Sequence, residues 1–159
     1  MASFRFEYFE NVITKHHLKK VTWQQAALSA FSSKLDNNKA SIESVRQIDE
    51  DTIEIVKRIT NKKNWLYKLG LEQYGVKERV IINRKEKSVA IDRMDIQWRR
   101  EGPFVGRRDL FLVNNDEENK LNFIRHDLWV SKLLKIDFQL MSNYAAWRYR
   151  RAFKAVPTA

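Results

Sequence analysis

The sequence contains no cysteine, which excludes disulfide bonds, cysteine-ligated zinc, iron–sulfur clusters and thiol catalysis. Only four glycines and two prolines occur in 159 residues, so glycine-rich nucleotide loops and long flexible linkers have little room. Neither a GxGxxG nor a Walker sequence is present, and nucleotide-dependent chemistry therefore has no support. No apolar run approaches the ~20 residues that a membrane-spanning helix needs, so we expect no transmembrane segment.

The N-terminal segment, MASFRFEYFE, lacks the continuous apolar stretch of a secretory signal peptide. Glu7 and Glu10 lie where mitochondrial presequences avoid acidic residues. We therefore expect no cleaved presequence.

The chain does have enough apolar surface for a core, and a large excess of positive charge. Its 43% apolar and 12% aromatic residues favour a folded protein, and its length predicts a single domain over residues 1–159. Lys and Arg number 30 and Asp and Glu number 20, which gives a formal net charge of +10. That charge favours an anionic partner, whether nucleic acid, a membrane surface or an acidic protein face.

Two helices are predicted, one toward each end of the sequence. Thr22 is a typical N-cap residue ahead of a helix over residues 23–35. The apolar spacing gives this helix an inward face made of Trp23, Ala27, Ala30, Phe31 and Leu35. A long helix is predicted over residues 136–154, with a core-facing stripe of Phe138, Met141, Ala145, Tyr149 and Ala152.

Alternating apolar and polar residues predict about six or seven strands, at 4–13, 41–48, 52–60, 77–84, 88–98, 107–113 and 121–133. Residues 62–74 break this pattern and predict a short amphipathic helix or an ordered loop. A change of apolar parity within 88–98 indicates a β-bulge near Asp92 and Arg93, or burial on both faces. The order indicates an α+β domain in which a curved antiparallel sheet packs on a long C-terminal helix, with an N-terminal helix and a short lid-like helix.

No set of residues predicts catalysis or metal binding. His16 and His17 are adjacent, as are His126 and Asp127, so on a strand each pair points to opposite faces. Asp92 and Asp95 diverge on a strand in the same way. We therefore expect no enzyme activity, no catalytic residue and no metal ligand.

The strongest chemical feature is a set of basic clusters. Arg99–Arg100 and Arg107–Arg108 flank a Gly-Pro turn. The terminal helix carries Arg148, Arg150, Arg151 and Lys154 among Tyr144, Trp147, Tyr149 and Phe153, with no acidic residue after Asp137. Such a mixture suits the phosphates of RNA, a lipid head group or a membrane surface. The alternative is a helix that packs on the sheet while its basic side is merely solvated.

Several segments together carry a family resemblance. Trp23 and the helix after it, the paired strands and charged turn of residues 78–98, and Phe104 with the strand 108–113 resemble the PRELI-like family of mitochondrial intermembrane-space phospholipid-transfer proteins. Ser142-Asn143 matches a Ser-Asn pair in the family's terminal helix, but its Lys-Gly pair falls on Ala146-Trp147. The chain therefore resembles a divergent member.

The resemblance implies a PRELI-like, START-like fold whose curved sheet and terminal helix enclose a lipid-sized cavity. It implies a non-catalytic protein that binds or transfers an anionic phospholipid at the inner membrane, in or beside the intermembrane space. It implies no cofactor other than a bound phospholipid. The protein partner that it implies is a small helical twin-cysteine protein.

Under this hypothesis, Asn143, Arg148 and Arg151 are the candidate phosphate contacts. Residues 62–74 take the place of the family's lid, with Trp65, Leu66 and Leu69 as apolar lipid contacts, although plain core packing explains these three equally well. Arg150 and Lys154 are expected to stay exposed and to face an anionic membrane or an acidic partner.

A second hypothesis is a PRELI-like domain recruited as a structural accessory subunit of a large inner-membrane assembly, such as a respiratory complex or ATP synthase. The missing Lys-Gly pair favours it, as does Trp147, whose bulk would fill space that a lipid needs. Nucleic-acid binding is disfavoured by dispersed acidic residues and by the absence of an RNP or KH signature.

Overall fold

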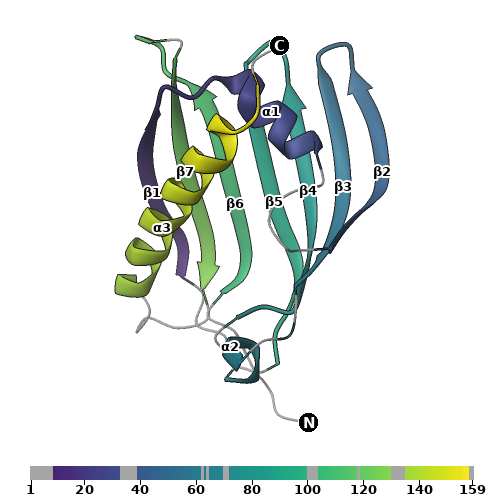
Figure 1. The fold of residues 1–159 in the computed structure, drawn as a ribbon, viewed down its shortest axis with the longest axis vertical. Coiled ribbons are helices and arrows are strands. Elements are labelled where there is room, and N and C mark those ends of the chain that lie inside the picture. Colours follow the sequence, from purple (N-terminus) through teal and green to yellow (C-terminus); the bar gives the residue numbers. More distant parts are fainter. Residues whose placement is uncertain are drawn as a thin grey trace.

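Seven strands form one antiparallel sheet in the order β1-β7-β6-β5-β4-β3-β2 (Figure 1). The computed structural model describes residues 9–32, 39–61, 63, 65–69, 72–99, 104–117, 119–129 and 135–157. The strands are β1 (Phe9–Lys19), β2 (Lys39–Asp49), β3 (Thr52–Thr60), β4 (Gly75–Asn83), β5 (Ser88–Gln97), β6 (Phe104–Val113) and β7 (Lys120–Trp129). Strands β2 to β7 follow one another as a meander, and β1 pairs with β7.

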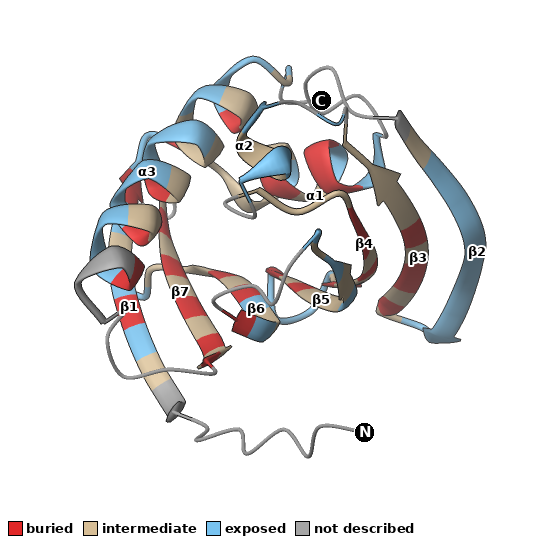
Figure 2. Ribbon diagram, turned by 90° about the horizontal axis from the view of Figure 1, so that it is seen from below, coloured by how far each residue is buried: buried red, intermediate tan, exposed pale blue. Residues whose placement is uncertain are grey.

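Three helices accompany the sheet, namely α1 (Trp23–Phe31), α2 (Trp65–Lys68) and α3 (Lys135–Lys154). The strands curve in an arc, and α1 and α3 lie on its concave side (Figure 2). The prediction of a mixed α+β fold, with a curved antiparallel sheet and a long C-terminal helix, is confirmed. No helix in the described part of the chain has the length and apolar character needed to cross a membrane.

Strand β1 continues well past residue 13, where the predicted strand ended. Thr14, His16 and Leu18 point inward, while Lys15 and His17, which lie between them, are exposed. Because two of these inward residues are polar, the alternation is weak in hydropathy, and the sequence pattern missed it. Residues 4–8 of the predicted strand lie outside the described residues.

Helix α1 begins with a capping box between Thr22 and Gln25. The backbone amide of Gln25 donates to Thr22 Oγ1 at 3.3 Å, and the backbone amide of Thr22 donates to Gln25 Oε1 at 2.9 Å. The helix ends at Phe31, and the predicted continuation over residues 33–35 lies outside the described residues. Its buried residues are Ala26, Ser29 and Ala30, whereas Phe31 is exposed. Of the predicted inward face, Ala30 is buried and Trp23 and Ala27 pack against the core, so the prediction fails at Phe31 and omits Ala26 and Ser29.

The bulge in β5 lies nearer the end of the strand than the sequence indicated. Arg93 pairs regularly with Glu78, but the register shifts between Lys77↔Met94 and Gly75↔Gln97. Asp95 and Ile96 thus oppose one residue of β4, and Asp95 takes a positive φ of 49°. The prediction of a bulge near Asp92 and Arg93 was wrong in position.

Two apolar clusters fill the concave side beneath α3. The larger one contains the rings of Phe111, Phe123 and Phe153, against which Tyr149 packs. The smaller one contains Phe104, Trp129 and Phe138.

The inward face of α3 is centred on Phe138, Ser142, Ala146 and Phe153, all of which are buried. The predicted stripe residues Met141, Ala145, Tyr149 and Ala152 are only partly buried. The face is thus shifted by part of a turn from the predicted one, because Ser142 and Ala146 let α3 lie close to the strands.

Candidate functional site

A row of ionic side chains crosses the concave face of the sheet between the two apolar clusters. Arg93 on β5 donates to Glu78 on β4 at 2.8 Å and to Asp109 on β6 at 2.7 Å. Arg125 on β7 donates twice to Asp109, at 2.7 Å and 2.9 Å. Tyr149 of α3 joins the row, since its hydroxyl donates to Asp109 at 2.6 Å and accepts from Arg93 at 2.7 Å.

The same row continues toward the smaller apolar cluster. Arg107 on β6 donates to both carboxylate oxygens of Asp127 on β7, each at 2.7 Å. The indole nitrogen of Trp129 donates to Asp127 at 2.9 Å. The Arg107 guanidinium also lies 3.9 Å from the centre of the Phe104 ring, a cation–π contact.

Burial and pairing determine the protonation of this row. Burial alone would raise the pKa of Asp109, but Arg125 and Arg93 outweigh it and hold that pKa far below its ordinary value. Burial raises the pKa of Tyr149 to about 12. At neutral pH the row therefore contains a carboxylate at Asp109 and a neutral phenol at Tyr149.

The formal charges of the row balance, with Arg93, Arg107 and Arg125 set against Glu78, Asp109 and Asp127. A phosphate entering here would have to displace a carboxylate that is already paired with a buried or nearly buried arginine. Removing one partner of a buried pair costs several kcal/mol, so this exchange is unfavourable. The row therefore acts as a structural link among β4 to β7 and α3.

The predicted phosphate contacts lie on the outside of α3. Asn143, Arg148 and Arg151 are all exposed. The Arg148 guanidinium lies 5.8 Å from the Tyr144 ring centre, and that of Arg151 lies 4.9 Å from the Trp147 ring centre. The structure thus brings these arginines together with exposed aromatic rings rather than with the interior.

Arg150 and Lys154 were both expected to be exposed, and they differ. Lys154 is exposed, whereas Arg150 is partly buried. The Arg150 Nη2 donates to the carbonyl of His17 on β1 at 3.4 Å. The Nε of Arg150 is buried and has no hydrogen-bond partner among the described residues. The expectation for Arg150 was therefore wrong, because α3 lies beside β1.

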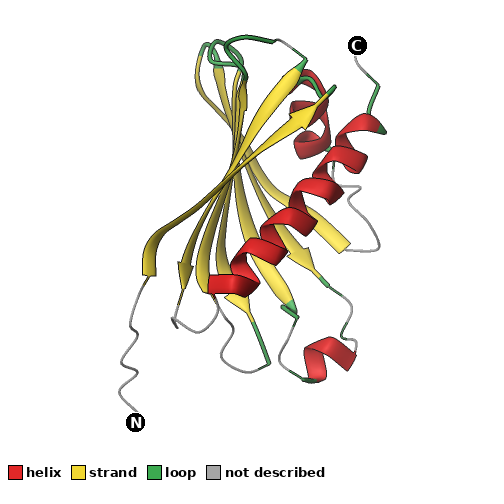
Figure 3. Cartoon of the chain, turned by 90° about the vertical axis from the view of Figure 1, so that its left-hand side faces the viewer, coloured by secondary structure: helices red, strands yellow, loops and turns green. Residues whose placement is uncertain are grey.

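The α2 segment projects beyond the end of the sheet between β3 and β4 (Figures 1 and 3). Trp65 is 67% exposed and Leu69 is 56% exposed, while Leu66 is partly buried. Plain core packing therefore does not account for Trp65 and Leu69.

The base of the α2 segment is well anchored. The Asn61 amide donates to the Tyr74 carbonyl at 2.7 Å, and Arg99 donates to the Lys68 carbonyl at 2.5 Å. Lys63 Nζ lies 4.5 Å from the Tyr74 ring centre. Lys63, Lys68 and Arg99 are exposed around Trp65 and Leu69.

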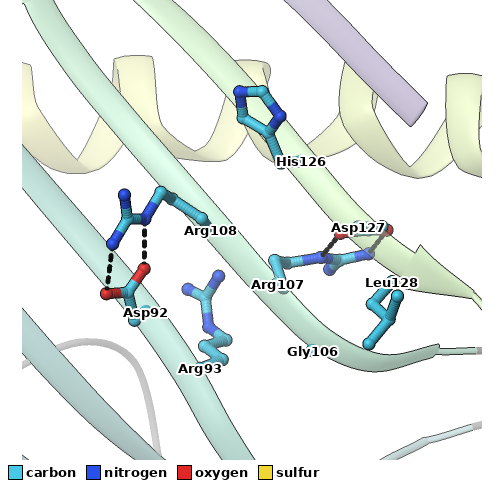
Figure 4. A pocket seen from close by; sticks show the side chains of 8 residues that line it. All are labelled: Asp92, Arg93, Gly106, Arg107, Arg108, His126, Asp127 and Leu128. Atoms are coloured by element: carbon cyan, nitrogen blue, oxygen red, sulfur yellow. Dashed lines mark hydrogen bonds and ion pairs between the residues drawn. The ribbon is translucent and has the colours of Figure 1, made fainter. Parts of the chain in front are cut away.

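A shallow depression of about 400 Å³ lies over β5, β6 and β7 on the face opposite α3 (Figure 4). It is lined by Asp92, Arg93, Gly106, Arg107, Arg108, His126, Asp127 and Leu128. Arg108 projects there, but both of its hydrogen bonds, at 2.5 Å and 2.8 Å, go to Asp92. Asp127 turns inward to Arg107, so His126 and Asp127 diverge as expected.

The other histidines also form no reactive group. His16 points inward, hydrogen-bonds Thr14 at 3.3 Å and stacks on Phe123, whereas His17 is exposed. Burial, followed by the charges of Arg125 and Arg150, lowers the pKa of His16. Across the described residues, no group of three or more His, Asp or Glu side chains is placed to hold a metal ion.

Sequence reasoning missed the ionic row, although a signal was present. Arg125 and Asp127 alternate with Leu121, Phe123 and Trp129 and therefore share their inward parity. Charged residues at inward positions of a strand predict buried ion pairs. The same holds for Asp109, which shares parity with Phe111 on β6.

No protein-family model matches the sequence. A search among curated proteins also finds no match.

Proposed function

We propose that the protein is a non-catalytic domain of PRELI-like, START-like type that binds anionic phospholipid at the mitochondrial inner membrane and can transfer it. The exposed apolar tip of the α2 segment is the observation that carries this proposal. Trp65 and Leu69 project from an anchored segment at the end of the sheet, with Lys63, Lys68 and Arg99 around them.

This tip has the chemistry of a membrane–water interface. Tryptophan rings and leucines enter the region between head groups and acyl chains, and lysine and arginine heads stay beside the phosphates. Each basic residue near an anionic surface contributes about 1 kcal/mol of attraction, which salt weakens. Residues 62–74 stand where the family resemblance expects a lid.

The test is co-sedimentation with vesicles that contain phosphatidic acid or phosphatidylserine, compared with vesicles of phosphatidylcholine alone. Changing Trp65→Ser with Leu69→Ser should abolish the preference for anionic vesicles. The matched control is Leu28→Ser with Phe31→Ser, since both residues are exposed and apolar but lie on α1.

Transfer is measured separately, as movement of a fluorescent anionic phospholipid between vesicles. It should fall together with vesicle binding in the α2 variant. Equal binding to neutral and anionic vesicles, or unchanged binding by the α2 variant, would refute the proposal.

A second candidate is the structural accessory subunit, which the position of Trp147 favours. The sequence suggested that Trp147 fills the interior, but Trp147 lies on the outside of α3. An exposed tryptophan that stacks on a neighbouring tyrosine is typical of a protein contact. Co-migration with a large inner-membrane complex on a native gel would support this candidate, and recovery only as a small soluble species would oppose it.

A further inference from the structure

Helix α3 is apolar on two opposite sides. Its inward side packs on the sheet through Phe138, Ala146 and Phe153. Its outward side exposes Leu140, Tyr144 and Trp147, which are 62%, 58% and 48% exposed. A helix on a protein surface normally presents polar residues to solvent, so this second stripe needs an explanation.

The spacing of the outward stripe is that of a helix–helix seam. Leu140, Tyr144, Trp147, Arg151 and Lys154 follow one another at intervals of four, three, four and three residues. This alternation is the a/d pattern by which one helix receives the side chains of another. The stripe is narrow, because the exposed polar residues Asn143 and Arg148 border it. A helix that lies in a membrane surface generally has a wider apolar face.

The aromatic part of the stripe is already ordered. The rings of Tyr144 and Trp147 are stacked, with centres 6.0 Å apart and planes at 27°. Arg151 lies over Trp147, and Arg148 lies over Tyr144. Side chains held in place before binding lose little conformational entropy when a partner arrives. Figure 3 shows α3 along the near side of the molecule, with no described element over it.

The charge of the stripe specifies its partner further. No acidic residue occurs between residues 138 and 154. Arg151 and Lys154 form no ion pair with any carboxylate of the described residues. The apolar residues occupy the N-terminal half of the stripe, and the basic residues occupy its C-terminal end.

We infer that the outward face of α3 is a docking site for an amphipathic helix of a protein partner. The partner helix has apolar side chains that pack on Leu140, Tyr144 and Trp147, and acidic side chains that meet Arg151 and Lys154. Tyrosine, tryptophan and arginine are the residues that most often dominate protein interfaces. This inference does not depend on lipid binding by α2, which lies elsewhere on the molecule.

The probe is a designed helical peptide with leucine at its a and d positions and glutamate at e and g, whose like charges oppose self-association. A second peptide carries lysine in place of glutamate. Binding of each peptide to the full chain is measured by calorimetry. The acidic peptide should bind and the basic peptide should not.

Two variants locate the site. Tyr144→Ser with Trp147→Ser should weaken binding of the acidic peptide by roughly tenfold or more, as loss of interface hot spots does. Arg151→Glu with Lys154→Glu should reverse the preference, so that the basic peptide binds instead. The matched control, Trp65→Ser with Leu69→Ser, should leave peptide binding unchanged while it abolishes vesicle binding.

Three results would overturn the inference. The first is peptide binding that the Tyr144 and Trp147 changes do not affect, and the second is absence of binding by either peptide. The third is loss of anionic-vesicle binding in the Tyr144 and Trp147 variant without any peptide binding, which would assign the stripe to a membrane. Circular dichroism checks that every variant is folded. We expect each to fold, because substitutions at exposed positions usually change stability little.

Discussion

The hydroxyl of Tyr149 on α3 donates a hydrogen bond to Asp109 on β6, with 2.6 Å between the two oxygens. The same hydroxyl accepts a hydrogen bond from Arg93 on β5 at 2.7 Å. The Tyr149 ring meets the Phe111 ring edge-on, with 4.9 Å between centres. One residue of α3 thus makes both polar and apolar contacts with the centre of the sheet.

We predict that Tyr149→Phe destabilises the protein by about 1–3 kcal/mol, because the ring is kept while a buried acceptor loses its donor. Urea unfolding measures the change. Tyr144→Phe is the control, since that ring is exposed and its loss of a hydroxyl should have little effect. Equal effects of the two changes would show that the hydroxyl of Tyr149 is not important for stability.

The same tyrosine predicts a loss of stability in alkali. Burial raises the pKa of Tyr149 from 10.0 to about 12. Between these values the unfolded chain releases a proton that the folded chain keeps, so stability falls as the pH rises from about 10 to 12. Stability of Tyr149→Phe should fall less over this range. Parallel pH dependence of the two proteins would contradict the prediction.

Asp109→Asn should destabilise the protein by about 3–5 kcal/mol, because Arg93 and Arg125 then lose the buried carboxylate that they share. Asp92→Asn is the control: its pair with Arg108 is partly exposed, and such pairs contribute about 0–1 kcal/mol. Chemical denaturation compares the two variants.

Asp109 also predicts acid sensitivity. Its pKa lies well below the ordinary value of 3.8, so its contribution is complete above that pH and is lost as the pH falls further. The Asp109→Asn variant should therefore show a weaker decline of stability in acid than the parent protein. A steeper decline would mean that Asp109 is not the carboxylate concerned.

The sheet and the terminal helix were predictable because their signals are local. Alternation of apolar residues specifies β3 and β4, where Ile53, Ile55, Val80 and Ile82 share one face. Helix α1 has a local start signal at Thr22, but its inward face was predicted only in part. Hydropathy correctly favoured Ala30 but also favoured Phe31, whereas close approach to the sheet favours the small residues Ala26 and Ser29.

The ionic row was hidden for a different reason. Arg93, Arg107 and Arg125 resemble surface residues when each is taken alone, and their burial depends on carboxylates from neighbouring strands. Those neighbours are set by register, and the bulge at Asp95 shows how one residue changes it. The outward direction of Arg148 and Arg151 likewise depends on how α3 is rotated over the sheet, which the sequence determined only to within part of a turn.

Two residues of α3, close together in sequence, test that rotation. Phe138 is buried against Trp129, with ring centres 5.7 Å apart, whereas Leu140 is exposed. Phe138→Ala should cost about 3–5 kcal/mol, as large-to-small changes in a core do. Leu140→Ala should stay within about 0.5 kcal/mol. Thermal and urea unfolding of both variants checks the prediction, which similar costs would contradict.

The final prediction separates Arg150 from Lys154, which lie one turn apart on α3. Arg150→Glu should destabilise the protein by about 1–3 kcal/mol, because the His17 carbonyl loses its donor and a carboxylate takes a partly buried position. Lys154 is exposed, so Lys154→Glu should cost at most about 1 kcal/mol, chiefly through the helix dipole. His16 provides a second readout. After burial and Arg125, the charge of Arg150 lowers the pKa of His16, so Arg150→Glu should raise that pKa and Lys154→Glu should leave it unchanged. An NMR titration of the His16 imidazole measures this directly, and an equal response to both variants would mean that α3 does not hold Arg150 beside β1.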